Sequence, residues 1–151
     1  MKTFFLRFFD FNYWANQTIA EFLIEHNIQD EQIIRIMSHL VHAQSNWYYR
    51  VLKQQADVPV WNNLPLVAIS DGLASNGELW VELINTFNEE DFNEKLDYKN
   101  MAGEPFLNTV SDVLTHLVNH STYHRGQVIY LIRSLGIAPP GTDYIRYAKM
   151  F

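Results

Sequence analysis

The chain has 151 residues, a formal net charge of -6 and 48% hydrophobic residues, which is typical of one globular domain spanning residues 1–151. A negative net charge without a run of lysine or arginine argues against nucleic acid as the main partner. The absence of cysteine excludes disulfides, thiolate nucleophiles and iron–sulfur clusters, so any metal must be held by histidine, carboxylate or water.

The N-terminal stretch MKTFFLRFFDFNYW has a superficial likeness to a signal peptide. Arg7 and Asp10 interrupt its apolar run, and no small-residue cleavage site follows. No apolar run approaches the roughly 20 residues that a membrane-spanning helix needs. We therefore expect a cytoplasmic protein without a membrane partner.

Two helices are predicted in the first third of the chain, at about residues 4–26 and 30–54, because apolar residues recur there at spacings of three and four. Asp30 is placed to cap the second helix. The connection between them is short, which makes the two helices antiparallel neighbours. The next stretch, QADVPVWNNLPLVAI, is longer than an ordinary loop. It can cross the length of a bundle and leave the second and third helices parallel.

The third predicted helix covers about residues 70–89, with Ser70 or Ser75 as its cap. After it, the alternation around KLDY and the turn-forming AGE predict a short β-hairpin. A fourth helix follows at about residues 109–135. These elements predict an all-α fold, a four-helix bundle with crossover connections and a β-hairpin between helices three and four.

The fourth helix is expected to start after Asn108 or Thr109 and to stop at Gly136, a natural left-handed C-cap. Its sequence THLVNHSTYHRGQVIYLIRSLG carries His116, His120 and His124 at steps of four residues. On a wheel of about 100° per residue, His124 lies within the apolar face, His120 at its edge, and His116 about 40° further round.

Two inward-facing imidazoles one turn apart need partners, because burying an unpaired polar group costs about 1–3 kcal/mol. A divalent cation takes a neutral ring nitrogen from each, and histidines at i and i+4 can both reach one ion. The alternative is a pair of core histidines that bond to backbone or tyrosine hydroxyl groups.

Two histidines make a weak metal site, so a third ligand is expected on another helix. The second helix offers His39 and His42 in SHLVHAQSNW. On the wheel, His42 falls among Arg35 and Tyr49 opposite the apolar stripe, and His39 falls nearer the boundary. Geometry alone leaves both open. His26 is expected to be a surface residue at the C-terminus of the first helix.

Several segments together resemble one known family. THLVNHSTYHRGQ resembles the signature HxxNHxxxHRGQ of the DinB/YfiT-like metalloenzymes, the DNA-damage-inducible family, which is distinct from the DNA polymerase of that name. FNYWANQTIAEFL resembles the family's aromatic-x-x-Trp-Ala-Asn opening, and SHLVHAQSNWYYRV its pattern of a histidine followed eight residues later by tryptophan. GIAPPGTDYIRY resembles its closing segment. The resemblance covers almost the whole chain.

The resemblance implies a bundle of up-down-down-up topology with a metal site of three histidines, one from helix two and two from helix four. Carried over residue by residue, these fall on His39, His120 and His124. Many family members have a carboxylate or a second histidine shortly after the helix-two ligand. Here Gln44 and Asn46 occupy that neighbourhood, which calls a protein base there into question.

Three neutral imidazoles leave a divalent metal with open positions, which suits catalysis better than structure. Zinc or nickel is the expected metal, and iron, copper or cobalt are compatible. The resemblance implies a homodimeric metal-dependent enzyme linked to stress response that acts on a small molecule. It would be an S-transferase that uses a low-molecular-weight thiol, or a hydrolase. The alternative is a non-catalytic homodimeric module that binds a metal or a ligand.

Three polar residues near His120 and His124 each have two possible roles. Arg125 either binds an anion or substrate carboxylate, or anchors a loop through Asp143. Asn119 either orients a ligand histidine or caps the hairpin. His116 is either a neighbour of the metal site or a partly exposed helix residue. Asn16 is expected to form hydrogen bonds between helices.

Overall fold

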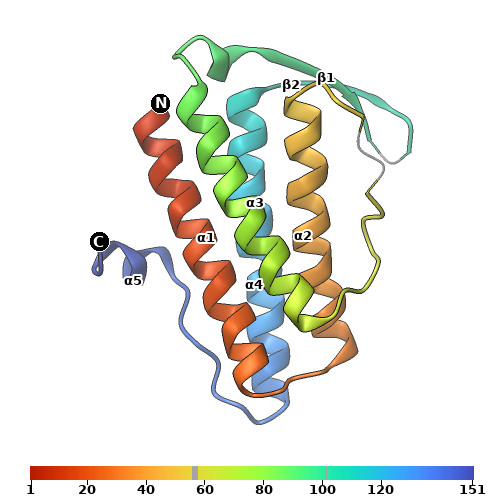
Figure 1. The fold of residues 1–151 in the computed structure, drawn as a ribbon, viewed down its shortest axis with the longest axis vertical. Coiled ribbons are helices and arrows are strands. Elements are labelled where there is room, and N and C mark those ends of the chain that lie inside the picture. Colours follow the sequence, from red (N-terminus) through yellow and green to blue (C-terminus); the bar gives the residue numbers. More distant parts are fainter. Residues whose placement is uncertain (56–57, 101) are drawn as a thin grey trace.

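The structure is a computed structural model that describes residues 1–55, 58–100 and 102–151. Figure 1 shows a bundle of four long helices, joined near one end to a two-stranded hairpin. The elements in chain order are α1 (Lys2–Glu25), α2 (Glu31–Val51), α3 (Leu66–Thr86), the 3-10 turn η1 (Asp91–Asn93), β1 (Lys95–Lys99), β2 (Pro105–Thr109), α4 (Val110–Ser134) and α5 (Tyr144–Ala148). Within the described residues, no helix has the length and apolarity that crossing a membrane requires.

The four long helices have the predicted up-down-down-up topology. In Figure 1, α1 and α4 run in one direction, and α2 and α3 run in the other. The segment between α2 and α3 returns along the outside of the bundle, so these two helices are parallel. Both α1 and α2 pack against α3 and against α4. The predicted fold class is therefore confirmed.

The ends of α2 and α4 are set by local side chains, as the sequence predicts. The carboxylate of Asp30 accepts hydrogen bonds from the backbone of Gln32 and Ile33, which begins α2. Thr109 and Asp112 form a reciprocal capping box that begins α4. After α4, Gly136 has a φ of +78°, the left-handed conformation expected of a C-cap glycine.

The prediction for α3 is wrong at its start. The helix begins at Leu66, with Pro65 at the capping position, and no side chain caps it. Ser70 lies inside the helix, where its hydroxyl donates to the amide oxygen of Gln17 at 3.3 Å. Gly77 also lies inside α3. The ring of Tyr13 on α1 occupies the place that a side chain at position 77 would take. A contact with α1, invisible in the local sequence, therefore explains this glycine.

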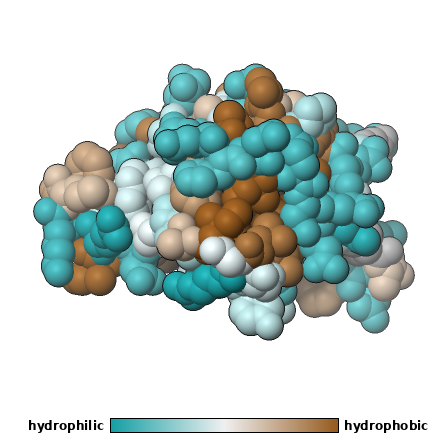
Figure 2. Space-filling model, turned by 90° about the horizontal axis from the view of Figure 1, so that it is seen from below, coloured by the Kyte–Doolittle hydropathy of each residue, from teal (hydrophilic) through white to brown (hydrophobic). Residues whose placement is uncertain are grey.

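The core consists of two clusters stacked along the bundle. The cluster next to the hairpin is rich in aromatic residues, and the aromatic side chains of α1 contribute to it. Its members include Phe5, Phe9, Phe11, Trp80 and Phe92. The other cluster is aliphatic and includes Leu23, Ile33, Met37, Leu73 and Ile132. Figure 2, a view of the end of the bundle that lies at the bottom of Figure 1, shows apolar side chains gathered at the centre of a hydrophilic rim.

Nothing in the packing of α4 requires a glycine at position 126. Gly126 lies in the middle of the helix, and a Cβ there would meet no atom within 4 Å. Because glycine in a helix is less favourable than alanine, we expect Gly126→Ala to raise the free energy of unfolding by about 0.5–1 kcal/mol. Urea denaturation measures the effect. Gly77→Ala is the contrasting control, expected to destabilise through its clash with Tyr13. A loss of stability at Gly126 would contradict the expectation.

Candidate metal centre

The three predicted histidines lie together between two packed helices. His39 comes from α2, and His120 and His124 come from α4. One nitrogen atom from each ring lies within 4.8 Å of the others, a spacing that could hold a metal ion. The ring centroids are 4.5 Å apart for His120 and His124, 4.8 Å for His39 and His124, and 5.0 Å for His39 and His120. The packing of α2 against α4 thus joins residues 81 positions apart.

A backbone oxygen selects which nitrogen of His39 is available. Nδ1 of His39 lies 3.1 Å from the carbonyl oxygen of Val60. Since a carbonyl only accepts, Nδ1 carries the proton and Nε2 keeps its lone pair. This Nε2 lies 3.1 Å from Nε2 of His120. Two nitrogens bound to one tetrahedral zinc at 2.0–2.1 Å would be about 3.3 Å apart, so the spacing fits a shared ion.

His124 is oriented by a side chain on its own helix. Its Nδ1 lies 2.8 Å from the amide oxygen of Gln127, so Nδ1 donates and Nε2 is the available ligand atom. Metal-binding histidines commonly donate their second ring nitrogen in this way, which fixes the tautomer and the ring. This role of Gln127 was not predicted from the sequence. Its spacing of three residues on the same helix is a signal that could have found it.

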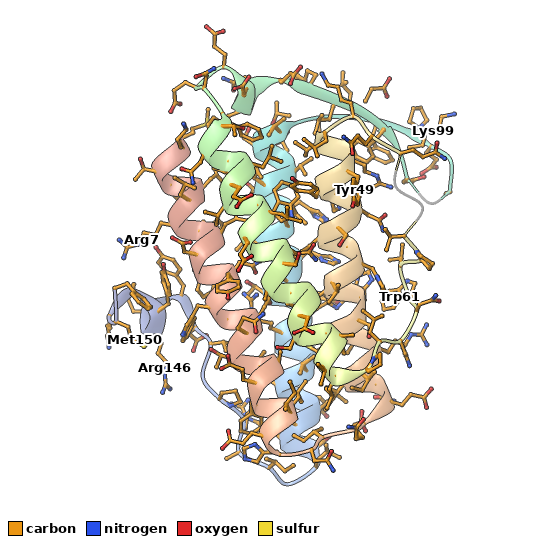
Figure 3. All side chains as sticks on the ribbon, viewed as in Figure 1. Arg7, Tyr49, Trp61, Lys99, Arg146 and Met150 are labelled. Carbon is orange, nitrogen blue, oxygen red and sulfur yellow. The ribbon has the colours of Figure 1, made fainter. Side chains whose placement is uncertain are left out.

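The segment between α2 and α3 covers the site on the α2 side. Trp61 stacks on the ring of His39, with the centroids 3.9 Å apart and the planes 7° from parallel. Figure 3 shows Trp61 on this segment alongside α2. The guanidinium carbon of Arg35 lies 5.2 Å from the centre of the Trp61 ring. Trp61 was not predicted to be near the site, because it reaches His39 only when this segment lies along α2 in the folded protein.

His42 faces the same covering segment, and the wheel interpretation of it needs correction. Its side chain is buried, and Nε2 donates to the carbonyl oxygen of Asn62 at 3.0 Å. A helical wheel treats α2 alone and places His42 away from the apolar stripe. In the fold, the residues after α2 cover that face. His42 therefore holds the covering segment and lies outside the group of three histidines.

Gln44 and Asn46 also have structural partners. Nε2 of Gln44 donates to the hydroxyl of Ser121 on α4 at 3.3 Å, and Nδ2 of Asn46 donates to the carbonyl oxygen of Val58 at 3.1 Å. Among the residues that the structure describes, the group that could hold a metal ion consists of three histidines and includes no carboxylate. The cluster itself therefore supplies no carboxylate base.

The site favours neutral imidazoles. Burial, followed by the neighbouring rings of His124 and His39, lowers the pKa of His120 to about 3. Burial also lowers the pKa of His39, against the opposing effect of its hydrogen bond to Val60. Neutral imidazole is the form that binds metals, so the environment keeps these rings in the form a ligand needs.

Comparison with known proteins identifies the family of this chain. The model of the DinB family matches residues 1–151. The chain belongs to the DinB family. It is similar to the protein DinB of Bacillus subtilis (strain 168), with 28% identity over 169 aligned positions that cover 99% of this chain and 96% of the relative. The family that the sequence motifs resemble is therefore confirmed.

A solved structure of a DinB-like protein from Bacillus cereus ATCC 10987 has a similar fold. The two structures align with a TM-score of 0.74 and 23% sequence identity, over 91% of this chain and 94% of that protein. At this level of identity the likeness concerns the fold alone.

The lowered pKa values in this DinB site make the stability of the metal-free protein depend on pH. An unfolded chain takes up protons as the pH falls through about 6.5, whereas the folded protein resists until much lower pH. Stability should therefore fall progressively below about pH 6.5. We expect chelator-treated wild-type protein to lose more stability between about pH 7.5 and about pH 5 than the His120→Gln variant. His26→Gln is the control, since His26 is exposed. Equal losses in wild type and His120→Gln would contradict this.

Three polar residues considered in the sequence, His116 and Asn119 on α4 and His26 at the C-terminus of α1, lie outside the cluster. The ring of His116 is exposed and lies 5.3 Å from His120 and 5.6 Å from Trp47. Asn119 donates to the carbonyl oxygen of Thr115 on its own helix, so neither of its predicted roles is seen. His26 is exposed with its Nδ1 3.0 Å from the carbonyl oxygen of Phe22, as predicted for a residue at a helix C-terminus.

Arg125 follows His124 in the family motif but points into the bundle toward α1. Its guanidinium donates to the amide oxygens of Asn12 and Asn16 at 2.7 and 2.8 Å, and to the hydroxyl of Thr122 at 2.8 Å. The predicted inter-helix role of Asn16 is thus confirmed. The predicted anchor to Asp143 is wrong: in the described part of the chain, Arg125 has no carboxylate within 4.0 Å. Burial lowers the pKa of Arg125 to about 9.

Proposed function

We propose that this protein binds a divalent metal ion through His39, His120 and His124 and catalyses a reaction of a small molecule at that ion. The observation that carries the proposal is the convergence of three ring nitrogens within 4.8 Å. The acceptors at Val60 and Gln127 leave Nε2 of His39 and of His124 free for an ion. A three-nitrogen donor set suits zinc or nickel.

The chemistry follows from an incomplete shell of protein ligands. A divalent ion held by these three histidines would keep open positions, and when bound it would lower the pKa of a coordinated thiol or water and polarise a carbonyl. Trp61 covers His39, whereas His120 and His124 are partly exposed. We therefore place the approach of a substrate on the α4 side of the cluster.

Of the two reactions expected from the sequence, thiol transfer fits the site better than hydrolysis of an amide. In an S-transfer, the thiol loses its proton to solvent, its sulfur forms a bond to an electrophilic carbon, and the leaving group departs with its electron pair. Hydrolysis of an amide also needs a proton donor for the leaving amine. The cluster contains no carboxylate to serve as that donor. A low-molecular-weight thiol is accordingly the proposed co-substrate.

The proposal is tested by screening metal-loaded protein against pairs of small thiols and electrophiles, and against panels of esters and amides. We expect thiol-dependent turnover in wild type and in His26→Ala, and none in His124→Ala. Turnover that persists in His124→Ala after chelation would overturn the assignment of the site.

A non-catalytic metal- or ligand-binding module is the second candidate. It is favoured by the identities of Gln44 and Asn46, because neutral amide side chains cannot act as a general base at these helix-two positions. A saturable small-molecule ligand with no turnover across the panels would support it. In either case we propose a homodimer, to be measured by light scattering coupled to size-exclusion chromatography. Of the aromatic residues of α1, Phe5, Phe9 and Phe11 are buried in the core, whereas Phe4 and Tyr13 are exposed.

A further inference from the structure

We propose that a second site, on the face of α4 opposite the histidines, binds a small oxyanion such as phosphate or a carboxylate. A pocket of about 340 Å³ lies between α4 and residues 140–143. Arg125, Gly126 and Arg133 line it from the helix. On a wheel of about 100° per residue, Arg133 and His124 lie roughly half a rotation apart, so this pocket is separate from the candidate metal centre.

The first support is an unbalanced buried charge. The side chain of Arg125 is 2% exposed, and its three hydrogen-bond acceptors are two amide oxygens and a hydroxyl, all neutral. The face of Phe11, 5.3 Å away, offers weak compensation. Buried charges are normally paired with an opposite charge. An anion in the adjoining pocket would supply the missing partner.

The second support is the charge around the pocket. Arg133 lines it and takes part in neither of the two salt bridges found among the described residues. A guanidinium nitrogen of Arg146, which is not part of the lining, lies close to the lining residue Gly141. One acidic residue, Asp143, also lines the pocket and opposes an anion. Two arginines against one aspartate leave the charge of the lining positive.

The third support is Gly126. This glycine costs helix stability, and no described side chain occupies the place of its Cβ. That place faces the pocket, because Gly126 is part of its lining. Folding gives no reason for a glycine at this position, whereas a binding site does, because a side chain there would enter the pocket.

The chemistry of the pocket selects the class of ligand. The fork of a guanidinium matches the paired oxygens of a carboxylate or of phosphate. The volume admits an inorganic ion or a compact dicarboxylate and is at the low end for organic ligands. Inorganic phosphate and malonate are therefore the two probes, and their relative affinity distinguishes phosphate-type from carboxylate ligands.

The test is calorimetric titration of the full chain with phosphate and with malonate at constant ionic strength, with chloride as the reference salt. We expect saturable binding of at least one probe to wild type. Arg133→Gln should weaken it by about tenfold, the loss of one charge-assisted hydrogen bond. Gly126→Leu should abolish it by filling the pocket. Arg7→Gln, which removes an exposed arginine on α1 that does not line the pocket, should bind like wild type.

Two results of the titration would overturn the proposal. One is the absence of saturable binding of both probes to wild type. The other is equal weakening in Arg7→Gln and Arg133→Gln, which would indicate non-specific charge. Light scattering on Gly126→Leu supplies a further check. If this variant keeps anion binding but changes its oligomeric state, the face belongs to an interface between copies of the chain and the anion site is wrong.

Discussion

Replacing His39 by alanine is expected to remove the bound metal, whereas replacing His42 by alanine is expected to leave it in place. The two histidines are one turn apart on α2, and both are buried. Only His39 reaches the rings of α4, at 3.1 Å from His120. Removing a group that merely orients a ligand weakens metal binding 10–100-fold, so we expect the loss of a ligand to cost more than about a hundredfold.

Elemental analysis of untagged protein measures the difference between these variants. His42→Ala should keep a metal content near that of wild type and lose about 1 kcal/mol of stability, because one hydrogen bond to Asn62 disappears. Metal lost from His42→Ala but kept in His39→Ala would reverse the assignment. Denaturation curves of both variants show whether a missing metal reflects the site or a failure to fold.

The second large effect is expected at Arg125, where methionine should destabilise the protein by about 2–4 kcal/mol. The substitution keeps most of the apolar stem but leaves the buried amide oxygens of Asn12 and Asn16 without donors. An unsatisfied buried acceptor costs about 1–3 kcal/mol, and removal of the unbalanced charge offsets part of that sum.

Arg133→Met is the matched control for this substitution. It makes the same change on the same helix at an exposed side chain, and we expect a change within about 0.5 kcal/mol. Urea denaturation of the chelator-treated proteins compares the two without a contribution from metal. Equal stabilities would show that the network between Arg125 and α1 contributes little to the fold.

The parts of the fold predicted best are those determined by neighbouring residues. Asp30 and Thr109 cap helices through backbone groups within three positions, so their role is visible in a short window. The hairpin and the C-cap at Gly136 are local for the same reason. The start of α3 escaped prediction because Ser70, read as a cap, is inside the helix and bonds to Gln17 on α1.

The candidate metal site shows the same difference between features set by neighbouring residues and features set by distant contacts. Helical spacing places His120 and His124 side by side on the inward face of one helix, and the family pattern makes them metal ligands rather than core histidines. The wheel left His39 and His42 both open, and the family pattern selected His39. The contacts of Trp61 and Val60 with His39 depend on where an irregular segment lies, which periodicity does not specify. Of the two roles considered for Arg125, the anchor through Asp143 is wrong, because its partners are asparagines of α1 more than a hundred positions away.

The hydrogen bond from His39 to the carbonyl oxygen of Val60 bears on the order of events during folding. The ligand nitrogen of His39 is selected by a backbone oxygen from a segment that must first cross the bundle. The three-histidine site is therefore complete only after this segment has packed against α2. We expect metal capture to be a late step, so the refolding rate of chelated protein should not increase when zinc is present from the start. Stopped-flow refolding with zinc added early or late distinguishes this order from metal-templated folding.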